Sequence, residues 1–283
     1  MTATRVATAL ALAPAVMALV WWAPLWIFAG ILGLIALLAM QEFFAIGEKA
    51  GMRGYWLWTG ICALVLSVAQ AAEARVDRFA QSDGMALLRF NEPSWISVEN
   101  ALLLFALGIT LAGTINRRPV AETLGAVGLC AGGLILVALP LSYLIRVQGL
   151  GSDGKLWTLF TLWLVWAGDS VAYFTGRAFG RFPMAPEISP KKTWEGAAGN
   201  LAGSLIVAIV FANWLNVPSL QLLGVAALAN AAGQAGDLLE SAYKRSAGVK
   251  DSGTILPGHG GVLDRIDALI FAAPVVWLCR QFL

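Results

Sequence analysis

The side chains best suited to bind phosphate or metal are concentrated between residues 237 and 267. This segment holds nine charged residues and the only histidine of the chain: Asp237, Glu240, Lys244, Arg245, Lys250, Asp251, His259, Asp264, Arg265 and Asp267. The rest of the chain is strongly apolar, and ionisable groups are costly to keep in or beside apolar membrane segments. Their concentration here therefore predicts a functional site.

Three aspartates in this segment predict a metal site. Asp264 and Asp267 are three residues apart, so both project from one face of a helix, and Asp237 lies near the end of an earlier apolar run. Carboxylates are the ligands that Mg²⁺ prefers, typically one or two together with substrate phosphates. We therefore expect Asp237, Asp264 and Asp267 to bind a metal. The alternative is that they form salt bridges with Arg265 and Lys250.

One helical face carries part of the same charge. Asp237, Glu240, Ser241 and Lys244 follow at spacings of three and four residues and therefore share a face. An ion pair of Asp237 or Glu240 with Lys244 is the ordinary interpretation. It accounts for Glu240 and Lys244, but less well for Asp237, which lies deeper in the apolar run.

The residues between the acids form a glycine-rich loop. Its glycines at positions 248, 253, 258, 260 and 261 allow backbone N–H groups to turn inward on an anion. Lys244, Arg245 and Lys250 would supply the positive charge that a polyphosphate needs. We expect Gly260 and Gly261 to lie at this anion site, and the alternative is an ordinary flexible connection.

A second polar segment, residues 169–196, is expected to form the other wall of the site. It contains Asp169, inside an apolar run, and then Ser189, Lys191, Lys192, Thr193 and Glu195. Ser189 as N-cap and Pro190 as the first helical residue predict a helix start. Lysines in a first turn oppose the helix dipole, and a bound anion would offset that cost. Lys191 and Lys192 are therefore candidate phosphate contacts, with anchoring at the membrane face as the alternative.

The elements that position these residues follow from hydropathy. The chain of 283 residues is 59% hydrophobic and 13% charged, with a mean hydropathy of +0.74, whereas soluble domains carry about 25% charged residues. A membrane helix needs about 20 apolar residues. We therefore predict an all-α polytopic integral membrane protein with about nine transmembrane helices, near residues 6–21, 24–41, 56–72, 98–115, 121–145, 156–176, 194–214, 219–241 and 262–281.

No separate soluble domain is indicated, so residues 1–283 are expected to form a single membrane domain. Residues 1–150 would supply scaffold helices, and residues 151–283 would carry the chemistry, with polar loops at 177–195 and 242–263. A stripe of small residues recurs every four positions before the first of these loops, at Gly168, Ala172, Gly176 and Gly180. Such a stripe is typical of a close helix-packing face.

Basic residues predict the orientation, because they are enriched in cytoplasmic loops. Thirteen of them fall on one side of the predicted spans and six on the other. The N-terminus is therefore expected in the cytoplasm, the C-terminus outside, and both polar loops on the cytoplasmic side. The formal charge of +2 gives no argument for a nucleic-acid partner. Cys62, Cys130 and Cys279 match neither a metal motif nor a disulfide framework.

The glycine-rich loop and its flanks resemble the hallmark of the phosphatidate cytidylyltransferases, the CDP-diacylglycerol synthases. The matching positions are Ser241, Lys244, Arg245, Lys250, Asp251, Gly253, Leu256, Pro257, His259, Gly260, Gly261, Val262, Asp264, Arg265, Ile266 and Asp267. The stretches 169–177 and 189–196 also resemble that family. The likeness in size and multi-span plan covers essentially the whole chain, but the N-terminal half is only generically similar. Tyr243 departs from the family pattern, which favours an aliphatic residue, Phe or Met.

This resemblance implies a reaction and a role for each residue. CTP and phosphatidate would give CDP-diacylglycerol and pyrophosphate, a step of phospholipid biosynthesis, with Mg²⁺ and room for a second, monovalent cation. The implied roles are metal binding by Asp237, Asp264 and Asp267, phosphate binding by Lys244, Arg245, Lys250 and Arg265, and either phosphate positioning or proton transfer by His259. The enzyme is expected to be a homodimer in the plasma (inner) membrane, with its active site facing the cytoplasm.

Two other functions stay open. The motifs do not distinguish lipid tails, so a membrane cytidylyltransferase could act instead on an isoprenoid ether lipid or a polyprenyl phosphate. An ion-coupled transporter would predict broken helices in corresponding places of two repeated halves. The sequence shows no such repeat, and its polar residues cluster toward one membrane face rather than the midplane.

Overall fold

The computed structural model describes residues 2–82, 96–115, 119–256 and 260–283, so His259 lies outside the described residues. The described chain is almost wholly helical and contains one short hairpin. In chain order its elements are α1 (Thr2–Trp22), α2 (Leu25–Lys49), α3 (Trp56–Ser82), α4 (Val98–Ile115), α5 (Val120–Gly132), η2 (Gly133–Ala138), α6 (Leu139–Gln148), α7 (Gly154–Phe179), β1 (Pro183–Ala185), β2 (Ser189–Thr193), α8 (Trp194–Leu215), α9 (Ser219–Ser246) and α10 (Leu263–Arg280).

A long helix or helical run is found at each predicted span. The run predicted at 121–145 consists of α5, η2 and α6 in succession, and η2 is a π-helical segment. Among the described residues, six helical segments are long and apolar enough to cross a membrane: Leu25–Lys49, Trp56–Asp77, Val98–Ile115, Val120–Gln148, Trp194–Leu215 and Ser219–Ser246. The protein is therefore an all-α integral membrane protein, while the count of nine spans and their orientation stay predictions.

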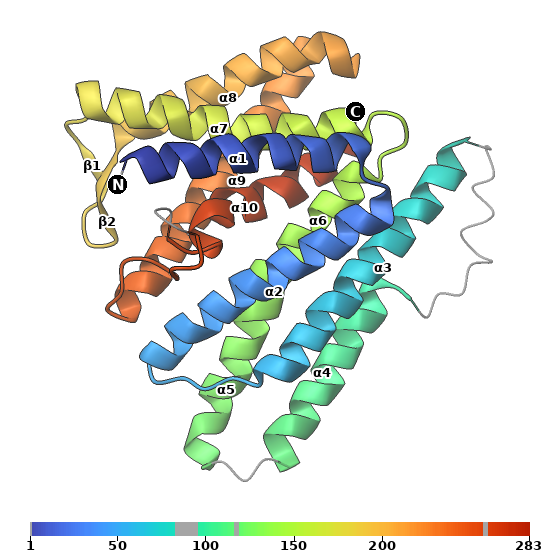
Figure 1. Cartoon of the computed structure of the whole chain (residues 1–283), viewed down its shortest axis with the longest axis vertical. Coiled ribbons are helices and arrows are strands. Elements are labelled where there is room, and N and C mark those ends of the chain that lie inside the picture. The colour runs from blue at the N-terminus through green and yellow to red at the C-terminus, as the bar shows by residue number, and fades with distance from the viewer. Residues whose placement is uncertain (1, 83–95, 116–118, 257–259) are drawn as a thin grey trace.

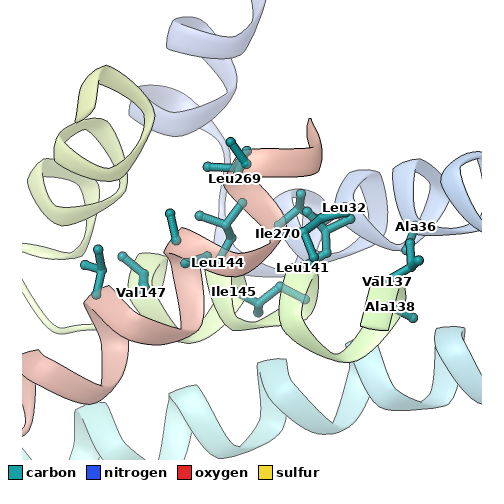
Figure 2. Packing of buried hydrophobic residues seen from close by; sticks show 14 of the residues in the cluster. Leu32, Ala36, Val137, Ala138, Leu141, Leu144, Ile145, Val147, Leu269 and Ile270 are labelled. Carbon is teal, nitrogen blue, oxygen red and sulfur yellow. The ribbon is translucent and has the colours of Figure 1, made fainter. Parts of the chain in front are cut away.

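Two groups of helices run in different directions through the molecule (Figure 1). Helices α2, α3, α4 and α5 are inclined together, whereas α1, α7 and α8 follow a second direction. Helix α6 packs between α2 and α10, and Figure 2 shows Leu141 of α6 beside Leu32 of α2 and Ile270 of α10. Leu141 and Ile270 are each only 1% exposed. This packing fixes α10, which carries Asp264 and Asp267, against the N-terminal half.

The predicted helix start at Ser189 and Pro190 is wrong. Residues 183–193 form an antiparallel hairpin in which Pro183 pairs with Thr193 and Ala185 with Ser189. Helix α8 begins at Trp194, and its N-cap is Thr193, whose hydroxyl accepts a hydrogen bond from the Gly196 N–H at 3.2 Å. Ser, Thr, Asp and Asn are all good N-caps. The choice between Ser189 and Thr193 was therefore decided by strand pairing, which local sequence does not show.

The small-residue stripe of α7 packs against α8, as predicted. A Cβ added at Gly168 would lie 2.3 Å from Oδ1 of Asn200 on α8. The approach is equally close from the other side, because a Cβ at Gly199 would lie 2.0 Å from Oγ1 of Thr175 and one at Gly203 would lie 2.8 Å from the Ala167 carbonyl oxygen. Only glycine allows two helix backbones this near each other. The packing holds Asp169 of α7 and the start of α8 at one site.

Candidate active site

Three carboxylates from two helices meet in one acidic group. Asp237 and Glu240 come from α9 and Asp267 from α10, and one oxygen of each lies within 4.8 Å of the others. Glycines on α9 make this possible: a Cβ at Gly236 would lie 2.3 Å from the Phe271 ring and 3.0 Å from the Asp267 carbonyl oxygen. The predicted meeting of Asp237 with the α10 aspartates is therefore seen for Asp267.

The acidic group has the donor set of a divalent-cation site. Two like charges about 4 Å apart repel by about 4 kcal/mol at an effective dielectric of 20. Glu240 is 5% exposed, and its Oε1 has no hydrogen-bond partner among the described residues. A buried carboxylate oxygen without a donor, next to two further carboxylates, is what a Mg²⁺ ion would satisfy. These residues therefore fit the predicted metal. Glu240 belongs to the acidic group in addition to the ion pair that its spacing from Lys244 predicts.

Asp264 lies in different surroundings. Its carboxylate accepts hydrogen bonds from Lys244 Nζ at 2.6 Å, from the Ser252 N–H at 3.0 Å and from the Gly261 N–H at 2.9 Å. Lys244 balances the charge of the carboxylate and the two backbone N–H groups occupy its oxygens, so this geometry favours a structural role for Asp264. Metal binding by Asp264 stays a prediction.

Lys244 is buried between two carboxylates. Its ammonium group contacts Glu240 on the same helix and Asp264 on α10, and its side chain is 11% exposed. The expected ion pair between Glu240 and Lys244 is therefore present. Phosphate binding by Lys244 stays a prediction, because in this structure the ammonium group joins α9 to α10.

A cavity of about 240 Å³ adjoins the acidic group. It is bounded by α7, the hairpin, α8 and α9, and its polar lining residues are Asp169, Tyr173, Lys191, Lys192, Thr193, Asn200, Gln234 and Asp237. Lys192 Nζ lies 2.7 Å from Asp237 Oδ2, so this cavity is lined by both a basic side chain and one member of the acidic group. The structure thus brings the two predicted walls together, with Lys191 and Lys192 on β2 rather than in a helix.

Amide side chains that the sequence analysis did not single out order one side of this cavity. Gln234 donates to Asn230 Oδ1 at 2.6 Å, Asn230 donates to Ser204 Oγ at 2.8 Å, and Asn200 donates to Asp169 Oδ1 at 3.1 Å. Asn230 also donates to Asn200 Oδ1. Polar side chains inside apolar helices are a signal in themselves. Asp169 is therefore held by a network that crosses α7, α8 and α9.

The other predicted residues occupy the edges of the site. Arg245 is exposed and donates to the carbonyl oxygens of Ile188 at 3.1 Å and Val249 at 2.9 Å, which joins the end of α9 to the hairpin. The Glu195 carboxylate accepts from the Phe182 N–H at 3.3 Å. Lys250, Asp251 and Arg265 are exposed. Gly260 has φ +83°, a left-handed conformation that favours glycine.

Comparison with known proteins identifies the relatives of the chain. The model of the cytidylyltransferase family matches residues 3–283. The chain belongs to this family. It is 38% identical over 178 residues to the phosphatidate cytidylyltransferase of Bacillus subtilis (strain 168), covering 62% of this chain and 66% of that protein. It is 46% identical over 129 residues to that of Haemophilus influenzae, covering 43% of this chain and 44% of that protein.

A further relative matches over a longer stretch. The chain is 32% identical over 254 residues to the phosphatidate cytidylyltransferase of Staphylococcus aureus (strain COL), covering 86% of this chain and 95% of that protein. The matched stretch therefore spans just under two thirds of the Bacillus protein, less than half of the Haemophilus protein and nearly all of the Staphylococcus protein. The predicted resemblance to this cytidylyltransferase family is confirmed.

One glycine of the glycine-rich loop gives a steric prediction. A Cβ at Gly261 would lie 2.0 Å from Ser252 Oγ and 2.3 Å from Glu42 Oε2, so Gly261→Ala must shift these two side chains, whose hydrogen bonds hold the loop against the start of α10. Misplacement of reacting groups by about 1 Å can lower rates by about 100-fold, and we expect a loss of that size in kcat. Gly128→Ala is the control, because its Cβ meets nothing within 4 Å. Wild-type kcat in Gly261→Ala would show that the loop position does not matter.

Proposed function

We propose that this protein is a phosphatidate cytidylyltransferase that makes CDP-diacylglycerol and pyrophosphate from CTP and phosphatidate. The observation that carries the proposal is a shared cavity. A lysine-bearing hairpin and a group of three carboxylates meet at Asp237, where Lys192 lies 2.7 Å away. Cationic side chains that can bind phosphates, next to carboxylates that can hold a metal ion, suit a nucleotidyl transfer. The names of the relatives agree with this reaction.

The reaction requires positioning and charge neutralisation more than a covalent nucleophile. An oxygen of the phosphatidate phosphate attacks the α-phosphorus of CTP. The bond from that phosphorus to the oxygen bridging to the β-phosphorus breaks, and pyrophosphate leaves with the electron pair. The phosphatidate oxygen is already ionised at neutral pH, so the step needs no strong base.

The residues of the cavity, of the adjoining acidic group and of the end of α9 take distinct roles in this proposal. Lys191 and Lys192 bind the phosphates of CTP from β2, and Arg245 adds positive charge at the end of α9. Asp237, Glu240 and Asp267 would hold Mg²⁺, which supplies neutralisation of the charge on the transferring phosphate groups. In this proposal the same carboxylates can also bind a second, monovalent cation. Asp169, oriented by Asn200, bounds the opposite side of the nucleotide cavity.

The proposal also places the enzyme in its membrane. The site faces the cytoplasm, where CTP is available, and phosphatidate stays in the cytoplasmic leaflet of the plasma (inner) membrane while its headgroup enters the site. The basic residues near the site support this orientation. The protein acts as a homodimer in this proposal. These points suit a nucleotide enzyme built from membrane helices, because its second substrate never leaves the bilayer.

A comparison of three lipid substrates, each supplied separately, tests the substrate assignment. Purified protein would receive radiolabelled CTP with phosphatidate, with a phosphorylated isoprenoid ether lipid, or with a polyprenyl phosphate, each in mixed micelles. We expect rapid labelling of phosphatidate and at least a tenfold lower kcat/KM for the other two lipids. Preferential labelling of either alternative lipid would show that this lipid, and not phosphatidate, is the substrate.

Lys192 provides a test of phosphate binding. A charged hydrogen bond contributes about 1.5–3 kcal/mol, so Lys192→Ala should lower kcat/KM for CTP by about 10- to 100-fold. Lys192→Arg, which keeps the charge, should recover part of the loss. Lys49→Ala, at an exposed position near the end of α2, is the control. An unchanged kcat/KM in Lys192→Ala would remove this lysine from the CTP site.

A further inference from the structure

A buried glutamate from the N-terminal half lies against the glycine-rich loop. Glu42 belongs to α2 and is 3% exposed. Its carboxylate accepts hydrogen bonds from Ser252 Oγ at 2.8 Å, from the Val262 N–H at 2.9 Å and from the Leu263 N–H at 2.8 Å. The second predicted span ends at residue 41, so Glu42 falls just outside it.

Glu42 serves as the N-terminal cap of α10 from another helix. The first backbone N–H groups of a helix have no partner within it, and negative charge near them is stabilising. The N-cap position of α10, Val262, makes no side-chain capping bond. Glu42 accepts from Val262 and Leu263 instead, one N–H to each carboxylate oxygen. A helix that carries Asp264 and Asp267 is thereby anchored at its first residue.

The loop is shaped to admit this carboxylate. A Cβ at Gly253 would lie 2.4 Å from Glu42 Oε1, and one at Gly261 would lie 2.3 Å from Oε2. A side chain at either position would therefore meet the Glu42 carboxylate, through Oε1 at Gly253 and through Oε2 at Gly261. The glycines at 253 and 261 therefore serve the approach of Glu42, in addition to any part the loop plays in binding an anion.

A continuous path of polar contacts leads from Glu42 to the acidic group. Ser252 donates its hydroxyl to Glu42 at 2.8 Å and its backbone N–H to Asp264 at 3.0 Å. Asp264 accepts from Lys244 at 2.6 Å, and Lys244 contacts Glu240, a member of the acidic group. Each step joins buried or half-buried groups, which water screens little. Displacement of Glu42 would therefore reach both α10 and the ammonium group beside Glu240.

We propose that Glu42 is a positioning residue, which sets the place of the α10 carboxylates and of the glycine-rich loop for the transfer reaction. It touches no substrate in this proposal and acts through Ser252 and the first residues of α10. The expected effects on kcat and on Mg²⁺ dependence rest on the proposed function. The expected effect on the position of the loop does not rest on it, and hydrogen exchange measures that effect directly.

Glu42→Gln keeps the size of the side chain but leaves one carbonyl oxygen to accept from two backbone N–H groups. Loss of groups that orient metal ligands typically costs 10- to 100-fold in metal affinity or activity. We expect kcat to fall by that factor, the Mg²⁺ concentration for half-maximal rate to rise at least threefold, and KM for phosphatidate to change less than twofold. Glu48→Gln, exposed on the same helix, should match the wild type in all three.

Hydrogen exchange gives the readout that does not depend on the reaction. In Glu42→Gln, amides of residues 249–256 and 260–266 should exchange faster, while those of α7 and α8 keep wild-type protection. A purely structural role would instead raise exchange throughout the bundle and lower the amount of active enzyme without moving the Mg²⁺ dependence. Wild-type exchange over 249–256 and 260–266, or wild-type kcat and Mg²⁺ dependence, would overturn the proposal.

Ser252→Ala is a second, milder variant for the case in which Glu42→Gln fails to fold. It removes one of the three donors to Glu42 and should lower kcat about threefold to tenfold, with local exchange as above. In the double variant the two effects should be non-additive, because residues on one path share their coupling. If the effects of the two substitutions were fully additive, Glu42 and Ser252 would not act through one path. If the wild type makes no CDP-lipid at all, the proposed function fails, and the exchange arm still decides whether Glu42 positions the loop.

Discussion

Asp267→Asn should lower kcat for CDP-diacylglycerol formation by about 10³-fold without lowering the thermal stability of the protein. Loss of one electrostatic group aimed at developing charge typically costs 10²–10³-fold. Asp267 is one of three carboxylates within 4.8 Å of one another. Lys192 pairs with Asp237 and Lys244 with Glu240, so Asp267 adds a further carboxylate charge beside two acids that already have basic partners. Its removal lowers the repulsion within the group when no cation is bound. Activity should therefore fall while stability stays unchanged or rises.

The comparison requires apo protein and a matched control. The thermal midpoint would be measured in detergent after removal of divalent cations, beside Mg²⁺-dependent kcat. Glu122→Gln removes a carboxylate from an exposed position on α5 and should leave both values unchanged. If Asp267→Asn lost activity only because it unfolded, the midpoint would fall with kcat. That result would remove Asp267 from the proposed metal site.

Asp264→Asn should lose both activity and stability. The Asp264 carboxylate is the acceptor for Lys244 and for the backbone N–H groups of Ser252 and Gly261. An asparagine carries no charge to balance Lys244, and hydrogen bonds to charged groups contribute about 1.5–3 kcal/mol. We expect a destabilisation of about 2–3 kcal/mol, and kcat at least 100-fold below the wild type because the loop and α10 lose their common anchor.

Both variants are therefore expected to lose activity, and they differ in the expected change of thermal stability. Stability that is unchanged in apo Asp264→Asn, combined with lost activity, would support the sequence-based assignment of Asp264 to the metal. A lowered midpoint for Asp264→Asn and an unchanged or raised midpoint for Asp267→Asn would support the arrangement seen in the structure. Circular dichroism and membrane insertion, measured on both variants, separate local destabilisation from failure to fold.

Hydropathy predicted the helices well because an apolar run long enough to cross a bilayer has little alternative to helix. The hairpin at 183–193 was not predicted. Its two strands pair with each other across a turn, and Ser189 and Pro190 suit a helix start although proline is also found on edge strands. Choosing between them required the pairing of Pro183 with Thr193. The continuation of α2 to Lys49 was also missed, since polar residues there were read as its end.

The site was predicted in its composition but not in its pairings. Spacing on one helix placed Glu240 and Lys244 together, and the structure confirms that contact. Nothing in the sequence indicated that Asp264 faces Lys244 while Glu240 completes the acidic group, because both facts depend on how α9 rotates against α10. Glu42 was missed for the same reason: it lies more than 200 residues from Ser252 along the chain and beside it in the fold.

The most direct test of the proposed reaction is to follow whether each phosphorus label of CTP ends in the lipid or in pyrophosphate. Purified protein would be supplied with phosphatidate and CTP labelled at either the α- or the γ-phosphorus, with and without Mg²⁺. The proposed reaction transfers the α-label into the lipid phase and releases the γ-label as pyrophosphate in equal amounts, and chelation of Mg²⁺ stops both. Transfer of the γ-label to lipid, or no lipid labelling with phosphatidate and Mg²⁺ present, would contradict it.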